Sequence, residues 1–415
     1  MKVTTAIQQR RIPRGVLDEL RGFTEFGKAT VETVLNQGGS RVPVFTNEFW
    51  TSRQRAANSL HEISYRACFK PQLPRFFIER FTQPGDVVYD PFMGRGTTLI
   101  EAAFLGRTPW GCDINPLCAA LVRPRLAPPT IEAVADRLRN MKFATKIEMP
   151  EPLLVFYHPE TLREICALRH YLCARRSDGD FDEVDGWIQM VAINRLTGHS
   201  PGFFSVYTMP PNQAVSVESQ KRINERLGQR PLRRVVPELI LRKTRSLQSD
   251  YVNGLRAVLE NASKVARVLV KDAAGTPELE DGSVALTVTS PPFLNIVDYA
   301  SDNWLRCWFL GFDSNSVAIT ACRRVEDWQM KMRGVFSELN RLLKFGGHVA
   351  FEVGEVNGGR VNLEDVVFPC GVDAGLEPVA ILINDQKFTK TANCWGVANN
   401  SKGTNTNRVL IFRKP

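Results

Sequence analysis

Two stretches that lie far apart in the chain combine residue types able to hold and activate an amino group. In the later one, Ser290, Pro291, Pro292 and Phe293 follow directly after the β-branched, apolar run 284–289. Prolines have no amide hydrogen and Pro292 restricts its predecessor, so a strand over this run must end in a rigid corner. The corner offers a hydroxyl, backbone carbonyls and a flat ring, which together can hold the exocyclic amino group of a nucleobase. Taken alone, the pattern also fits a proline-rich loop after a strand.

The earlier stretch places glycines and carboxylates where a small ligand could bind. Asp90 ends a predicted strand and precedes Gly94 and Gly96, which let the backbone approach a ligand ahead of a helix N-terminus. Asp113 and Asp272 fall at the tips of two further predicted strands, where an acidic side chain can chelate ribose hydroxyls. An acidic loop suits a positively charged cofactor, so S-adenosylmethionine fits better than NAD. The structural alternative is that the glycines form a tight turn and the aspartates cap helices or turns.

Strands and helices alternate in a way that brings these residues to one edge of a sheet. The pattern predicts an α/β fold with a mostly parallel sheet, and such sheets bind ligands at the carboxyl ends of their strands. Strands are predicted at 87–89, 111–113, 267–272, 284–289, 346–353, 379–383 and 408–412, and helices at 96–105 and 326–343.

The sheet pattern lapses between the two stretches for a length that no plain loop explains. We therefore divide the chain into an N-terminal arm (1–47, helical or poorly ordered), a domain in two parts (48–125 and 262–415) and an insertion (126–261). The insertion is predicted to be largely helical, with helices at 131–143, 159–175 and 185–196.

The end of the insertion is strongly basic. Between residues 221 and 245 there are nine Lys or Arg against two Glu. Such a run can bind phosphates, although a solvated helix face has the same composition. The residues predicted to bind nucleic acid are Lys221, Arg222, Arg226, Arg230, Arg233, Arg234, Arg242 and Lys243.

The overall composition limits the classes of protein. A net charge of +9 points toward a polyanionic partner, although many enzymes are mildly basic without one. We find no apolar run able to span a bilayer and no apolar signal-peptide core, and the nine cysteines contain no CxxC pair, so a cytoplasmic protein with reduced thiols is expected. The five histidines are dispersed, and no metal site is predicted.

The segment from Asp90 to Thr98, taken with Thr289 to Phe293, resembles the amino-methyltransferases of DNA. This family transfers methyl from S-adenosylmethionine to cytosine N4 or adenine N6. Phe69-Lys70-Pro71 and the strand Gly347–Val353 resemble it as well, so the resemblance covers about 60–125 and 265–412. It implies a Rossmann-like methyltransferase fold with a twisted, seven-stranded, mostly parallel sheet. The two-part domain is then the catalytic domain, and the insertion is the candidate target-recognition region.

The resemblance also implies roles for single residues. Asp113 would hold the ribose hydroxyls and Asp272 the adenine amino group, while Ser290 and the Pro291 carbonyl would accept the two amino hydrogens of a flipped-out base. Phe293 would stack on that base beside Pro292, and no cysteine nucleophile is needed. The remaining cofactor-binding residues would be Phe69, Lys70, Asp90, Pro91, Phe92, Gly94, Gly96, Thr97 and Asn115.

Several alternatives remain open from the sequence. Family members with Ser before Pro-Pro tend to methylate cytosine N4, which favours a site-specific cytosine-N4 enzyme on double-stranded DNA, alone or with a restriction system. The alternatives are adenine N6, an amino group of structured RNA, and a non-catalytic nucleic-acid-binding protein with the same fold. Arg95 stands where the family often has Ser, so its partner could be the cofactor carboxylate, a phosphate or solvent.

Overall fold

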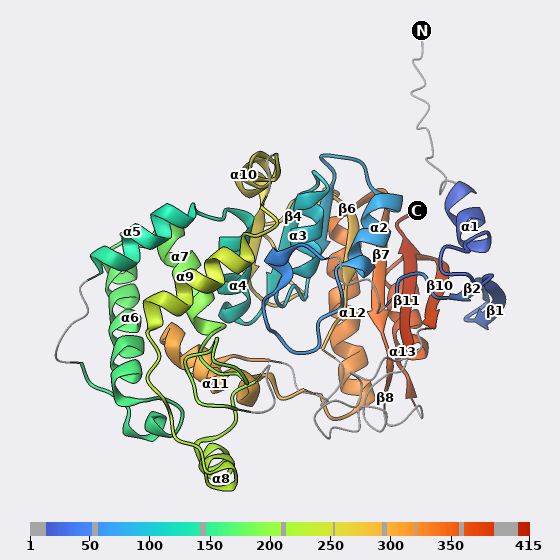
Figure 1. Cartoon of the computed structure of the whole chain (residues 1–415). Helices are drawn as coiled ribbons and strands as arrows, with labels where there is room; N and C mark the ends of the chain where they lie inside the picture. The colour runs from blue at the N-terminus through green and yellow to red at the C-terminus, as the bar shows by residue number, and fades with distance from the viewer. Residues whose placement is uncertain are drawn as a thin grey trace.

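The computed structural model describes residues 14–51, 57–141, 147–208, 213–251, 254–292, 297–319, 322–356, 361–385 and 406–415. Within these residues the chain is organised around one nine-stranded sheet, in the order β1-β2-β10-β11-β7-β6-β3-β4-β5. Helices cover both faces of the sheet, and a separate layer of helices stands beyond its β5 end (Figure 1). A short hairpin, β8 (Glu355–Val356) with β9 (Val361–Asn362), lies apart from the sheet.

The central strands are parallel, as predicted. β7, β6, β3, β4 and β5 run in the same direction, and β11 lies antiparallel between β10 and β7. The predicted mostly parallel, seven-stranded sheet is therefore confirmed as the run from β10 to β5, and the α/β fold class with it. The strands are β1 (Val31–Gln37), β2 (Ser40–Asn47), β3 (Val87–Asp90), β4 (Thr108–Asp113), β5 (Arg267–Val270), β6 (Val284–Thr289), β7 (Leu343–Val353), β10 (Glu377–Asp385) and β11 (Thr406–Arg413).

Strand β6 is the middle of the fold. All six of its residues are buried, because helices pack on both faces, and this explains why its sequence is a continuous run of apolar residues and threonines. It lies between β7 and β3, and all three are parallel. The carboxyl ends of β6 and β3 therefore meet at one edge of the sheet, which brings Ser290 close to Asp90.

Two hydrophobic clusters fix the helices to the sheet. On one face, residues of the first two long helices, such as Leu20 and Phe77, pack with Leu286 and Val288 of β6. On the other face, Phe336 and Phe368 of two late helices pack with Phe351 and Phe412 of the sheet. The helices concerned are α1 (Arg14–Arg21) and α2 (Gln72–Phe81) on the first face, and α12 (Val325–Leu342) and α13 (Leu363–Asp373) on the second.

The predicted N-terminal arm is partly wrong. Residues 31–47 form the hairpin β1–β2, and β2 pairs in parallel with β10, placing Val44 opposite Ile381. The alternating burial of β2 is that of a strand with one face on a core. Its partner lies far along the chain, so no local sequence pattern indicates the pairing. The sheet therefore begins at Val31 rather than after residue 47, and residues 1–13 lie outside the described part of the chain.

The insertion is helical, as predicted, but it is not a separate body. Its buried residues, such as Trp187 and Leu162, belong to one hydrophobic cluster with Leu99 and Leu121 of the sheet-covering helices. The later helix α11 (Tyr299–Leu310), which follows the Ser-Pro-Pro corner, also packs in this layer, against α4 and α6 (Figure 1). The other helices are α3 (Thr97–Phe104), α4 (Pro116–Leu126), α5 (Ile131–Asn140), α6 (Pro159–Ser177), α7 (Glu183–Ile193), α8 (Val217–Leu227), α9 (Val236–Leu247) and α10 (Leu255–Val265), with short 3-10 turns at Ser59–His61, Glu151–Val155 and Ser314–Ser316.

Candidate active site

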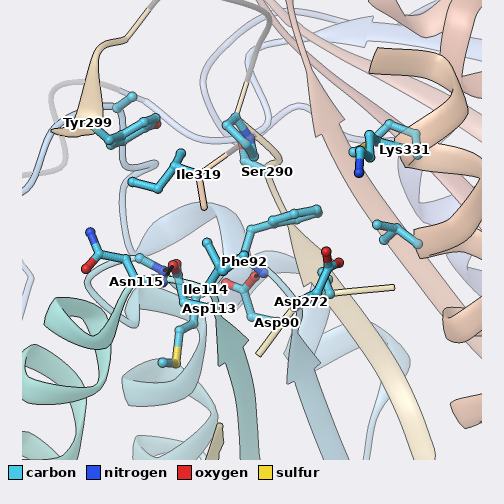
Figure 2. Close-up of a pocket in the computed structure, with 18 of the residues that line it drawn as sticks. Asp90, Phe92, Asp113, Ile114, Asn115, Asp272, Ser290, Tyr299, Ile319 and Lys331 are labelled. Atoms are coloured by element: carbon cyan, nitrogen blue, oxygen red, sulfur yellow. Dashed lines mark hydrogen bonds between the residues drawn. The ribbon is translucent and has the colours of Figure 1, made fainter. Parts of the chain in front are cut away.

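A cavity of about 370 Å³ opens at the carboxyl edge of β3, β4 and β6. Asp90, Asp113 and Asp272, from the ends of three strands, line it together with Ser290 and Pro292 (Figure 2). The two stretches singled out in the sequence therefore face one cavity.

No helix of the described part is long and apolar enough to cross a membrane.

Asp90 is the buried floor of this cavity. Its carboxylate is 1% exposed and accepts hydrogen bonds from the Thr289 hydroxyl at 2.6 Å and the Phe92 amide at 3.0 Å. Burial raises the pKa of Asp90 to about 7, although these bonds oppose the rise. A cation bound beside Asp90 would stabilise its ionised form, so the site favours a positively charged ligand.

Asp113 and Asn115 shape the next strand end. The Asp113 carboxylate accepts the amides of Gly94 at 3.0 Å and Asn115 at 2.9 Å, and burial raises its pKa. Asn115 lines the cavity but also caps helix α4, because its side chain accepts the Leu117 amide at 3.0 Å. The capping role of Asn115 is therefore compatible with the cofactor contact predicted for it.

The two glycines of the loop do different things. Gly94 has φ +48° and lines the cavity, whereas Gly96 is not among the lining residues. Gly96 has φ +75°, and a Cβ there would lie 2.5 Å from Val122 Cγ2. Gly96 is thus required for the close approach of α3 and α4, a structural role that the motif alone did not indicate. Thr97, one residue later, lines the cavity.

Arg95 binds the segment 63–69, part of which lines the cavity, and this identifies the partner of its side chain. Its guanidinium donates to the carbonyls of Ile63 at 3.0 Å and Phe69 at 3.4 Å. Arg95 does not line the cavity, whereas Phe69 does. Ala67 in this segment also lines the cavity, with φ +54°, a backbone conformation that only glycine adopts easily.

Some of the other predicted cofactor residues line the cavity and some do not. Pro91 and Phe92 line it, and Lys70 does not. Asp272 lines it from an exposed position and accepts the Ala274 amide at 2.9 Å, so it also stabilises a turn.

The Ser-Pro-Pro corner is held by two residues that sequence reasoning missed. Strand pairing sets Thr289 opposite Phe351, so the next residues, Ser290 and Glu352, are neighbours. The Ser290 hydroxyl hydrogen-bonds to Glu352, which is 5% exposed and has a pKa raised by burial to about 7. The available signal was an acidic residue inside the otherwise apolar strand 349–353.

The second missed residue is Trp328 on α12. Its indole Nε1–H donates to the Pro292 carbonyl at 2.8 Å, and its side chain is 2% exposed. Trp328 lines the cavity with Pro292, whereas Pro291 is buried and does not. Phe293, the predicted stacking residue, lies outside the described residues.

Aromatic residues line another part of the same cavity. Tyr65 and Tyr299 stack with ring centroids 6.0 Å apart and an interplanar angle of 22°. Figure 2 shows Tyr299 and Ile319 on the same side of the cavity as Asn115. Tyr299 begins helix α11, so the cavity extends to the helical layer.

None of the predicted phosphate-binding residues lines the cavity, and two of them already have acidic partners. Arg233 pairs with Glu160 at 2.6 Å and with Glu164 at 3.2 Å, and Lys243 pairs with Glu62 at 2.9 Å. Arg234, which precedes α9 in the chain, is half-buried. Those left exposed are Lys221, Arg222 and Arg226 on α8, Arg230 after it, and Arg242 on α9.

The profile of the N6_N4_Mtase family, described as DNA methylase, matches residues 32–122. The type II methyltransferase M.BsoBI of Geobacillus stearothermophilus is 24% identical over 303 residues, which cover 62% of this chain and 54% of that protein. M.MjaII of Methanocaldococcus jannaschii is 33% identical over 94 residues, covering 23% and 17%. The chain thus spans about half the length, or less, of these relatives.

A solved geranyl diphosphate methyltransferase in complex with S-adenosylmethionine is 10% identical, with a TM-score of 0.34 over 83% of this chain and 85% of that chain. So low a TM-score adds nothing to the family assignment. The profile match contains Asp90 and Asp113 and ends before Ser290. Together with the relatives, it confirms that the chain is similar to the amino-methyltransferases of DNA, as the motif around Asp90 predicted.

Proposed function

We propose that this chain is an S-adenosylmethionine-dependent DNA methyltransferase that modifies the exocyclic N4 of cytosine. The observation that carries the proposal is the single cavity that joins Asp90, Asp113 and Asp272 to Ser290 and Pro292. A methyl donor and an acceptor amine must share one site for direct transfer, and this cavity offers both kinds of lining. Action beside a restriction system is part of the same proposal and rests on the family resemblance.

The residues present fit S-adenosylmethionine. The cavity volume of about 370 Å³ lies within the range of small-molecule sites, and three carboxylates from successive strand ends line it. Asp90 would face the positive end of the cofactor, Asp113 the ribose hydroxyls and Asp272 the adenine amino group. When bound, the cofactor supplies an electrophilic methyl group.

The chain's own residues would activate the amine and remove its proton. A hydroxyl has one proton and two lone pairs, so Ser290 can accept an amine N–H while donating to Glu352. The Pro292 carbonyl is already bound by Trp328, which leaves the Pro291 carbonyl as the second acceptor. As the nitrogen gains a methyl group, its proton would pass to Ser290 Oγ, and the Ser290 proton to the Glu352 carboxylate. A pKa of about 7 suits Glu352 to this role near neutral pH.

The choice of cytosine rests on Ser290 at the first position of the corner, as in the cytosine-N4 members that this sequence resembles. The test is mass spectrometry of nucleosides from the DNA of a host expressing the chain, with Ser290→Ala as the inactive control. N4-methylcytosine that disappears in the control supports the proposal. N6-methyladenine would keep the mechanism and refute the choice of cytosine. If neither modified base is found, the proposal of a DNA methyltransferase is refuted.

A further inference from the structure

Arg195 and Arg242 lie beside the loop 198–207, and the positive charge of a third arginine, the buried Arg306, acts on Arg195. Arg195 follows α7, Arg242 lies on α9 and Arg306 on α11. A Cβ built on Gly202 of the loop would lie 3.5 Å from Arg242 Nη2 and 3.9 Å from Arg195 Nη1. Burial and the positive charges of Arg306 and Arg242 lower the pKa of Arg195 to about 10. The three guanidinium groups therefore form one electrostatic cluster, which we call the arginine cluster.

The charge of this cluster is not balanced by neighbouring acids. In the described part of the chain, none of the three arginines makes an ion pair with a carboxylate. The sequence outside the described ranges contains no Asp or Glu. The acidic groups facing the cluster already have partners: Glu62 pairs with Lys243 at 2.9 Å and Asp302 with Arg66 at 2.7 Å. Asp298 also acts on Arg66, so five cations face three carboxylates, a local excess of two positive charges.

The guanidinium groups are nevertheless held in place. Arg195 lies over the Phe203 ring at 4.0 Å and donates to the Asn194 carbonyl at 2.9 Å. Arg242 donates to the Pro201 carbonyl at 3.3 Å, and Arg306 to the Asn303 side chain at 3.1 Å. Oriented cations lose little conformational entropy when an anion binds. Like charges held together without acidic partners indicate a site for an anion.

Helix α11 connects the cluster to the cavity. Tyr299, in its first turn, lines the cavity, and Asp302, one turn later, bonds Arg66, which also lines it. Arg306 follows one further turn along the same face, about 10 Å from Tyr299 at 1.5 Å per residue. Duplex DNA rises about 3.4 Å per step, so this length of α11 corresponds to about three nucleotides of a strand that leaves a base held in the cavity.

We propose that Arg195 and Arg242 of the arginine cluster bind the phosphodiester backbone of the DNA strand next to the target base, while the buried Arg306 adds its positive charge. The inference rests on the proposed function and specifies which surface of the insertion contacts the substrate. Arg195 and Arg306 lie outside the basic run 221–245, and only Arg242 of the cluster belongs to the surface predicted from sequence.

The test is the salt dependence of binding to a duplex oligonucleotide, measured by fluorescence anisotropy with the full-length protein. Each lost phosphate contact lowers the slope of log affinity against log salt by about one. We expect the Arg195→Gln/Arg242→Gln double variant to lose about two in slope, and Arg242→Gln, at an exposed site that does not threaten folding, about one. The control is Lys264→Gln on α10, an equal charge loss on an exposed residue of another helix (Figure 1).

The outcomes separate this inference from the proposed function. A reduced slope in both cluster variants, with Lys264→Gln and cofactor binding unchanged, supports the inference. A wild-type protein that binds duplex DNA with the same slope as both cluster variants overturns the inference and leaves the proposed function standing. A wild-type protein with no affinity for duplex DNA overturns both.

Discussion

Replacing Glu352 with Gln should make the protein more stable at alkaline pH while removing its activity. The carboxyl group is 5% exposed, and burial raises its pKa from 4.5 to about 7. A raised pKa means that the folded state prefers the protonated acid. The wild-type protein therefore has full stability from this group below about pH 4.5 and loses it as pH rises through 7. A difference of about 2.5 pKa units corresponds to about 3 kcal/mol above pH 7.

Gln keeps the shape and the hydrogen bonds of the protonated acid but never ionises. It can accept from the Asn407 amide, which the carboxylate also does, and can donate to Ser290. We therefore expect the free energies of unfolding of wild type and variant to agree at pH 4.5, and the variant to exceed wild type by about 3 kcal/mol at pH 8. Turnover should fall about 10²- to 10⁴-fold, the usual loss for a general base.

The assay is urea unfolding of both proteins at several pH values, with a separate measurement of methyl transfer and cofactor affinity. Other titrating groups are common to both proteins, so they cancel in the difference between them. A difference in unfolding free energy that stays constant from pH 4.5 to 8 would refute the raised pKa of the buried Glu352 carboxyl group. Unchanged turnover with the predicted stability gain would show that Glu352 is buried but takes no part in the reaction.

Three further changes test the site by different means. Cofactor affinity should weaken up to tenfold per unit as pH falls below 7, because Asp90, with a pKa of about 7, loses the charge that attracts a cation; Asp90→Asn should bind weakly and abolish this dependence in a calorimetric titration at pH 5.5 to 8.5. Trp328→Phe should lower kcat about tenfold with cofactor affinity within twofold, because it removes the Nε1–H donor to the corner, whereas Trp304→Phe, which removes the same ring volume and an indole bond to Val215, should leave both unchanged. Gly96→Ala should destabilise the fold by about 2–3 kcal/mol in urea unfolding, because its Cβ would lie 2.5 Å from Val122 Cγ2, and the added change Val122→Ala should restore part of this loss; equal stability of Gly96→Ala and wild type would contradict the packing role.

The parts of the site that follow from local sequence were predictable. Asp90 and Asp113 each end a strand and Ser290 directly follows one, the composition of these strands is visible in the sequence, and parallel strands bring their carboxyl ends together. Glu352 was missed because its role depends on the pairing of β6 with β7, which joins residues 62 positions apart. Gly96 was predicted to bind the cofactor, yet the side chain next to it is Val122 of α4.

Residues that act through distant partners were also beyond local reasoning. The direction of the Arg95 side chain depends on the segment 61–69, which only the folded chain places beside it. The arginine cluster unites three segments of the chain whose sequences show no common motif. The basic run 221–245 was visible by composition, but Arg233 and Lys243 within it have acidic partners that composition cannot reveal.

The pairing of β2 with β10 sets an order for folding during synthesis. Val44 and Ile381 are 337 residues apart, so at about 5–20 residues per second the ribosome needs roughly 20–70 s to supply the partner strand. Until then the hairpin β1–β2 has no neighbour, and an isolated two-stranded hairpin is only marginally stable in water. Its edge would remain open to other chains over that interval. The nascent protein is therefore most exposed to misassembly at its beginning, and the last strands made are those that secure the first.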